Sequence, residues 1–88
     1  MSNLDYLEAS FSTLTMSIGS SAIMAMGLAP NPTTGEIEKN QEIAAFNIDL
    51  LLVLKEKTKN NLTSDEDNFL SNLINDLQMK YVHMKSSQ

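Results

Sequence analysis

Residues 50–74 read LLLVLKEKTKNNLTSDEDNFLSNLI, and this stretch decides the fold. Its apolar run passes into three lysines between residues 55 and 59, which favour the negative C-terminal end of a helix. The two asparagines at 60–61 can adopt the left-handed backbone conformation that ends a helix. The sequence TSDE at 63–66 matches a capping box, the pattern that begins one. So short a turn between two helices predicts an antiparallel helical hairpin.

Apolar residues repeat at helical spacing on both sides of this turn. We expect one helix at residues 40–59, with Asn40 as its N-cap, and a second at residues 64–84. The main apolar stripe of the first comprises Ile43, Phe46, Leu50, Leu51 and Leu54, and it is widened by Ala44, Ile48, Leu52 and Val53. The stripe of the second comprises Phe69, Leu70, Leu73, Ile74, Leu77, Tyr81 and Met84.

The N-terminal part of the chain carries no charge over 27 consecutive residues, from Ala9 to Gly35. Apolar residues recur there at spacings of three and four, so we expect a long helix at residues 4–27, with Ser2 or Asn3 as its N-cap. Glycine at position 19 costs such a helix about 1 kcal/mol relative to alanine, which packing should offset. Small residues let another helix approach closely. Small residues form a row on this segment at every fourth position. The row comprises Ala9, Thr13, Ser17, Ser21, Ala25 and Ala29.

Residues 28–39 are expected to connect this helix to the hairpin. The connection contains two prolines and a turn at 33–35 whose glycine can take a positive φ. At about twelve residues it is long for a helix–helix connection, and its Pro30–Glu36 loop is either a partner contact or a rigid spacer. The chain is therefore expected to form one all-α domain over residues 1–88. We predict a small three-helix protein, with a long uncharged N-terminal helix plus an antiparallel hairpin, completed by oligomerisation.

Charge and composition exclude several classes of partner. Eleven acidic and six basic residues give a net charge of −5, and every basic residue is a lysine. A negative chain without arginine repels nucleic acid and lacks the bidentate phosphate ligand, so we expect no nucleic-acid partner. The absence of cysteine and of a basic N-terminal region predicts a cytoplasmic protein. The uncharged stretch is long enough to span a membrane, but its serines and threonines argue against insertion.

No group of residues has the spacing that catalysis or metal binding requires. His83, the single histidine, lies where an imidazole favours a helix C-terminus. The acidic run at 65–67 lacks the glycine of a calcium loop and is accounted for by capping. Ser17, Ser20 and Ser21 have no base nearby in the sequence, and their hydroxyls are expected to bond to carbonyls four residues earlier or to a neighbouring helix. We therefore expect no enzyme, no metal and no cofactor.

Several short motifs occur in order along the chain. They are FSTL at 11–14, SIGSSA at 17–22, GLAPNP at 27–32, TGE at 34–36, LKEKTKNNLT at 54–63 and MKYV at 79–82. With these motifs the chain resembles, from Phe11 to Val82, a family of short bacterial proteins known only as a domain of unknown function. The resemblance implies a small, soluble, all-helical bacterial protein and supplies no activity, cofactor or site residue. The chain differs from the family pattern at Lys80, where arginine is common.

The surplus of apolar surface leads to a functional hypothesis. We predict a non-enzymatic protein–protein interaction module that forms a homodimer or tetramer through its N-terminal helix, with another protein as a further partner. The expected interface comprises Leu7, Phe11, Leu14, Ser17, Ile18, Ser21, Ala22 and Ala25. The alternative is a binding module in which a Met-lined groove near Leu28 takes an apolar ligand or an amphipathic peptide. An open apolar pocket in the assembled protein would favour that alternative.

Overall fold

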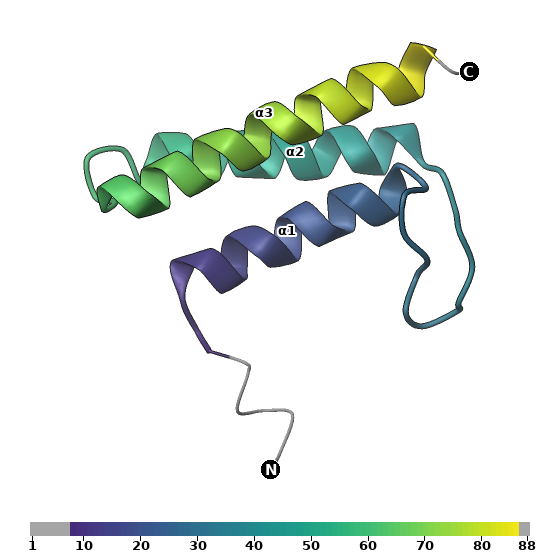
Figure 1. Cartoon of the computed structure of the whole chain (residues 1–88), viewed down its shortest axis with the longest axis horizontal. Helices are drawn as coiled ribbons and strands as arrows, with labels where there is room; N and C mark the ends of the chain where they lie inside the picture. The colour runs from purple at the N-terminus through teal and green to yellow at the C-terminus, as the bar shows by residue number, and fades with distance from the viewer. Residues whose placement is uncertain (1–7, 87–88) are drawn as a thin grey trace.

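The computed structural model describes residues 8–86, which form three helices (Figure 1). Helix α1 spans Phe11–Ala25, α2 spans Gln41–Lys57 and α3 spans Ser64–Ser86. Figure 1 shows α2 and α3 as an antiparallel hairpin, with α1 packed along α2 and running in the opposite direction to it. The prediction of an all-α three-helix protein is confirmed.

The start of the N-terminal helix differs from the prediction. Residues 8–10 are not helical and α1 begins at Phe11, so the predicted start near residue 4 is wrong. Ser10 is the N-cap, because its backbone is extended and its hydroxyl accepts a hydrogen bond from the Thr13 N–H at 3.1 Å. The helix is therefore about 22 Å long, rather than the roughly 36 Å that residues 4–27 would give. Both predicted N-caps, Ser2 and Asn3, lie outside the described residues.

Backbone contacts hold together the two ends of the connection between α1 and α2. The backbone N–H of Asn40 donates to the Ala25 carbonyl at 2.7 Å, and Met26 pairs with Lys39 in an isolated antiparallel β-bridge. The side chain of Asn40 accepts a hydrogen bond from the Ile43 N–H at 3.0 Å, which confirms the predicted N-cap of α2. The connection therefore leaves α1 and returns to begin α2 at nearly the same point.

The turn between α2 and α3 has the predicted local structure. Asn60 has a left-handed backbone, with φ of 69°. The Thr63 N–H donates to Glu66 Oε1 at 2.9 Å, and the Glu66 N–H donates to Thr63 Oγ1 at 3.1 Å. The two bonds form a reciprocal capping box that satisfies two donors at the start of α3.

The core lies between the three helices, and α1 contributes mostly small residues to it. A Cβ at Gly19 would lie 3.1 Å from Leu73 Cδ2, so the glycine lets α3 approach the backbone of α1 closely. This contact is the packing that offsets the low helix propensity of Gly19. The buried hydrophobic cluster comprises Ala22, Ala25, Met26, Ala44, Ile48, Leu51, Leu70, Ile74, Leu77 and Met84.

The face of α2 that enters this core coincides only in part with the predicted main stripe. Ala44, Ile48 and Leu51 are buried, whereas Ile43 and Phe46 are 46% and 57% exposed. The apolar arc of α2 is wider than one packed face, and the helix turns its Ala44 side towards the shared core. Part of the predicted stripe therefore remains on the surface.

Gly27 provides a test of the connection. Its φ is +77°, and a Cβ there would lie 2.7 Å from Lys39 Cγ, so Gly27→Ala adds both backbone strain and a clash. We expect the free energy of unfolding to fall by about 2–4 kcal/mol, measured by urea denaturation. Gly35→Ala is the matched control, because its φ is +74° but nothing lies within 4 Å. That variant should lose only about 1–2 kcal/mol. Equal losses would show that Lys39 does not pack tightly on Gly27.

Candidate functional site

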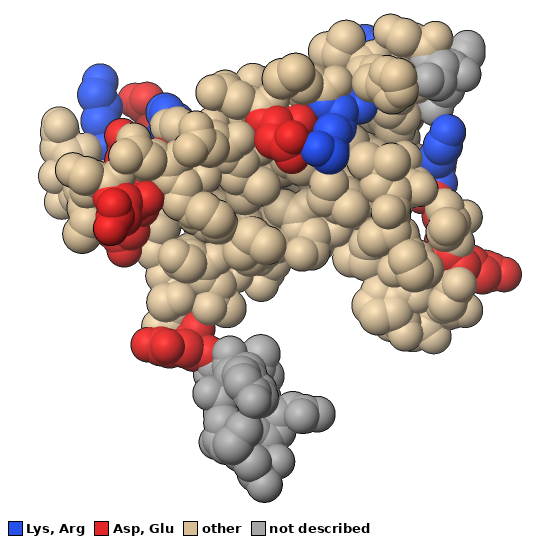
Figure 2. Space-filling model, viewed as in Figure 1, with Lys and Arg blue, Asp and Glu red and all other residues tan. Residues whose placement is uncertain are grey.

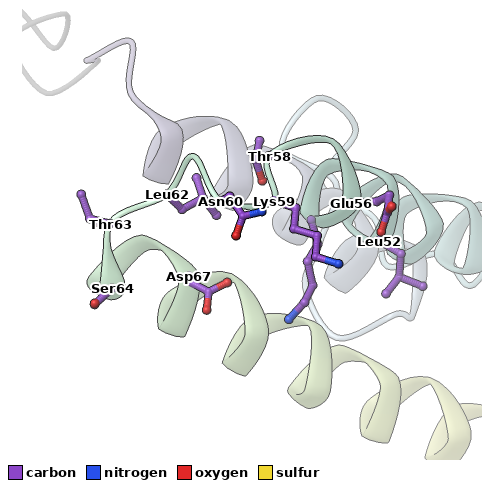
Figure 3. A pocket seen from close by; sticks show the side chains of 10 residues that line it. Leu52, Glu56, Thr58, Lys59, Asn60, Leu62, Thr63, Ser64 and Asp67 are labelled. Atoms are coloured by element: carbon purple, nitrogen blue, oxygen red, sulfur yellow. The ribbon is translucent and has the colours of Figure 1, made fainter.

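A polar pocket of about 630 Å³ lies at the α2–α3 turn (Figure 3). Several of its polar side chains are engaged in holding the turn. The Thr58 hydroxyl donates to the Leu54 carbonyl at 2.7 Å, Thr63 belongs to the capping box, and Lys55 Nζ donates to the Ser71 hydroxyl. The pocket is therefore a consequence of the turn. Its lining residues are Leu52, Lys55, Glu56, Thr58, Lys59, Asn60, Leu62, Thr63, Ser64 and Asp67.

A second, more apolar groove of about 580 Å³ lies where the end of α1, the end of the connection and the later turns of α3 meet. Met26 and Met84 are buried in its floor, whereas Leu28 and Met79 are 57% and 74% exposed. The structure thus contains a Met-lined groove at Leu28, where the sequence suggested one. Its occupant stays a prediction. The lining residues are Met26, Gly27, Leu28, Lys39, Asp76, Met79, Lys80, His83 and Met84.

The predicted self-association interface is divided by the structure. Leu7 lies outside the described residues. Ala22 and Ala25 are buried in the chain's own core, and Phe11 and Ile18 pack against that core. The residues of this set that remain at the surface are Leu14, which is 49% exposed, Ser17, which is exposed, and Ser21, which is half-buried.

These three residues belong to a larger surface shared by α1 and α2. Two rows with the same 3-4-3 spacing run along it, and the half-buried Ser21 and Met24 of α1 line a hollow together with Ile43 of α2. The two rows therefore adjoin where the end of α1 meets the start of α2, and the two helices pack along each other. We call this surface the outer face; it comprises Leu14, Ser17, Ser21 and Met24 on α1 and Ile43, Phe46, Leu50 and Val53 on α2.

The outer face differs in charge between its two helices. No charged residue occurs on α1, whereas Glu42, Asp49 and Glu56 form an acidic row beside the apolar row of α2. Figure 2 shows the side of the molecule on which α3 lies in front of α2: uncharged atoms cover most of it, one acidic and one basic group lie together in the upper middle, and further charged side chains lie towards its two ends. The apolar row of α2 is thus bordered by carboxylates on one side and by an uncharged helix on the other.

Three of the hydroxyls on α1 donate hydrogen bonds within the helix. The Ser17 hydroxyl donates to the Thr13 carbonyl at 2.9 Å, and the Ser21 hydroxyl donates to the Ser17 carbonyl at 3.2 Å. The buried Thr15 hydroxyl donates in the same way to the Phe11 carbonyl at 2.7 Å. The predicted bonding to carbonyls four residues earlier is confirmed for Ser17 and Ser21. The side chains of Ser17 and Ser21 are therefore small, and their hydroxyl groups already donate to backbone carbonyls.

The described residues contain no group of three or more acidic or histidine side chains placed to hold a metal ion. Among the helices of residues 8–86, none has the length and apolar character needed to cross a membrane. Glu66 acts in the capping box, as expected for the acidic run at 65–67, and His83 lines the Met-lined groove.

Comparison with known proteins gives one match. A family model described as "Domain of unknown function (DUF1844)" matches residues 8–83, which is most of the chain. Neither the curated proteins nor the solved structures contain a match.

The assignment of Thr63 to capping can be tested directly. Thr63→Ala removes the hydroxyl that accepts from the Glu66 N–H, and it should lower the free energy of unfolding by about 0.5–2 kcal/mol. Ser64→Ala is the control, since the next residue has a similar hydroxyl that is not part of the capping box. Thermal denaturation by circular dichroism measures both. A larger loss in the Ser64 variant would contradict the assignment.

Proposed function

The chain belongs to the DUF1844 family of unknown function, and we propose that it is a non-enzymatic module that self-associates. The family description assigns no activity, so the proposal is argued from the outer face. The observation that carries the proposal is the exposed apolar row of α2, in which Phe46 and Val53 are 57% and 54% exposed. Contiguous exposed apolar rows of this kind are typical of protein–protein contact sites. We propose a second copy of the chain as the partner.

The shapes of the two rows favour one arrangement of the copies. The row of α2 is bulky, with Phe46 and Leu50 at its centre, whereas the row of α1 is small at Ser17 and Ser21. We therefore place the α2 row of each copy on the α1 row of its partner. Because one face carries both rows, a single twofold axis makes both contacts at once. With that axis parallel to the helices, α1 of each copy runs antiparallel to α2 of the other, as in an up-and-down four-helix bundle.

Charge supports the same arrangement. If α2 packed on α2 of the partner in antiparallel orientation, the acidic row of Glu42, Asp49 and Glu56 would face its own copy. Like charges brought together in this way repel each other. Packing α2 on the uncharged α1 avoids that repulsion. The proposal thus accounts for the absence of charge on α1.

Two further parts of the proposal rest on the sequence. We propose that the protein acts without catalysis, because the hydroxyls of Ser17 and Ser21 are engaged in the helix and have no base beside them in the sequence. We also place it in the cytoplasm, which the absence of cysteine supports.

The mass in solution tests self-association. Light scattering at micromolar concentration should give a multiple of the 9.7 kDa chain mass. Phe46→Asp should shift the protein towards a folded monomer, because it places a charge in the centre of the apolar row. Val82→Asp is the matched control on α3, where the side chain is 61% exposed, and it should leave the mass unchanged. A monomer for the native chain would overturn the proposal.

The small row of α1 can be tested by filling it. Ser17→Leu should overpack the approach of the partner's α2 by about 1–3 kcal/mol, which raises the dissociation constant roughly 5- to 150-fold. Ser12→Leu, at an exposed position outside the outer face, should leave it unchanged. Sedimentation equilibrium of the two variants provides the comparison. Tighter association of the Ser17 variant would show that the row does not pack closely.

A further inference from the structure

The Met-lined groove lies outside the outer face and has an apolar interior. Its volume of about 580 Å³ is within the range of small-molecule sites, roughly 300–1,000 Å³. Met26 and Met84 are buried in its floor, and the more exposed Leu28 and Met79 lie beside them. Thioether side chains are flexible and adapt to apolar ligands of different shape. The interior therefore suits an unbranched apolar chain.

A lysine is held in position at the edge of this groove. Lys39 pairs with Met26 through the backbone, and the adjacent Asn40 N–H donates to the Ala25 carbonyl. The absent side chain of Gly27 leaves room for the stem of Lys39, whose Cγ and Cε lie 2.7 Å and 3.2 Å from where a Cβ would be. Lys39 therefore lies across the end of α1, beside the methionines.

The carboxylates next to Lys39 in the sequence are directed elsewhere. Glu36 and Glu38 line a separate hollow with Ser21 and Ile43, whereas Lys39 lines the groove. This division is consistent with the alternation of side chains along an extended segment. The chain as a whole carries a charge of −5, yet the one acid that lines the groove with Lys39 is Asp76, which is paired with Lys80.

The second lysine of the groove is already neutralised. Lys80 Nζ contacts both oxygens of Asp76, at 2.8 Å and 2.9 Å. Within residues 8–86, Lys39 makes no such ion pair. The groove therefore has an apolar floor and one uncompensated cation at its edge, beside an ion pair that balances itself.

From this combination we propose that the groove binds a medium-chain carboxylate. The carboxylate accepts a hydrogen bond from Lys39 Nζ, and the hydrocarbon tail lies on Met26, Met79 and Met84. Burial of the tail supplies most of the affinity, and the charge selects the head group.

Titration with dodecanoate below its micellar concentration, followed by calorimetry, tests the proposal. We expect one dodecanoate per chain, with dodecanol bound more weakly and dodecyltrimethylammonium at least tenfold more weakly. Equal binding of the anionic and cationic amphiphiles would overturn the assignment of the head group. Absence of dodecanoate binding would overturn the site, and binding of dodecanol in preference to both would indicate an uncharged apolar ligand instead.

Paired variants separate the site from non-specific binding. Lys39→Glu and Met79→Glu should each weaken dodecanoate binding at least tenfold. Their controls are Lys59→Glu at the α2–α3 turn and Val82→Glu on α3, which should leave binding within twofold of the native chain. Equal losses in variants and controls would contradict a defined site. Helicity measured by circular dichroism confirms that each variant is folded.

The ligand site and self-association can fail independently. The Phe46→Asp variant should still bind dodecanoate, because Phe46 does not line the groove. Loss of binding in that variant, with native helicity, would overturn a site contained within one chain. Dodecanoate binding by a native chain that is monomeric would leave the groove assigned and the proposed self-association overturned.

Discussion

The fold depends on the fastening of the connection at Asn40. Its backbone N–H bonds to the Ala25 carbonyl at the end of α1, while its side chain caps the start of α2. Asn40 therefore holds the end of the connection against the end of α1 and also begins α2. As a result, α2 lies alongside α1 and runs in the opposite direction. The same junction directs Met26 into the core and Lys39 to the edge of the Met-lined groove. The arrangement of the bundle and the position of the groove thus have a common origin.

Features set by local hydrogen bonding could be predicted from the sequence, because all their partners lie within a few residues. The cap at Asn40 and the capping box at 63–66 are of this kind. The start of α1 could not be predicted from apolar spacing, because that spacing continues across the cap at Ser10. The sequence also did not determine which side of α2 is buried in the core. Its apolar arc is wider than one face, and contacts with the other helices decide which part of that arc is buried. The groove near Leu28 was only partly predictable, because Met79 and Met84 come from α3, distant in the sequence.

Small residues have two different consequences on the two sides of α1. Gly19 faces Leu73 of α3, so its lack of a side chain is used within the chain. Ser17 lies on the outer face, where it leaves a shallow surface beside the bulky row of α2. In the sequence, Gly19 and Ser17 are simply two small residues of the same segment. Only the position of α3 shows that Gly19 is packed within the chain and that Ser17 lies on the outer face. This is why the interface predicted from α1 alone included Ala22 and Ala25, which the core already uses.

The internal hydrogen bonds of the α1 hydroxyls determine how this surface responds to the solvent. Because the hydroxyls of Ser17 and Ser21 already donate to backbone carbonyls, a neighbouring surface has no need to supply an acceptor for them. The helix also has no charge for dissolved ions to screen. A contact along α1 should therefore tolerate high concentrations of sodium chloride that weaken interfaces built on ion pairs. Sulfate, which is excluded from protein surfaces, should strengthen such a contact.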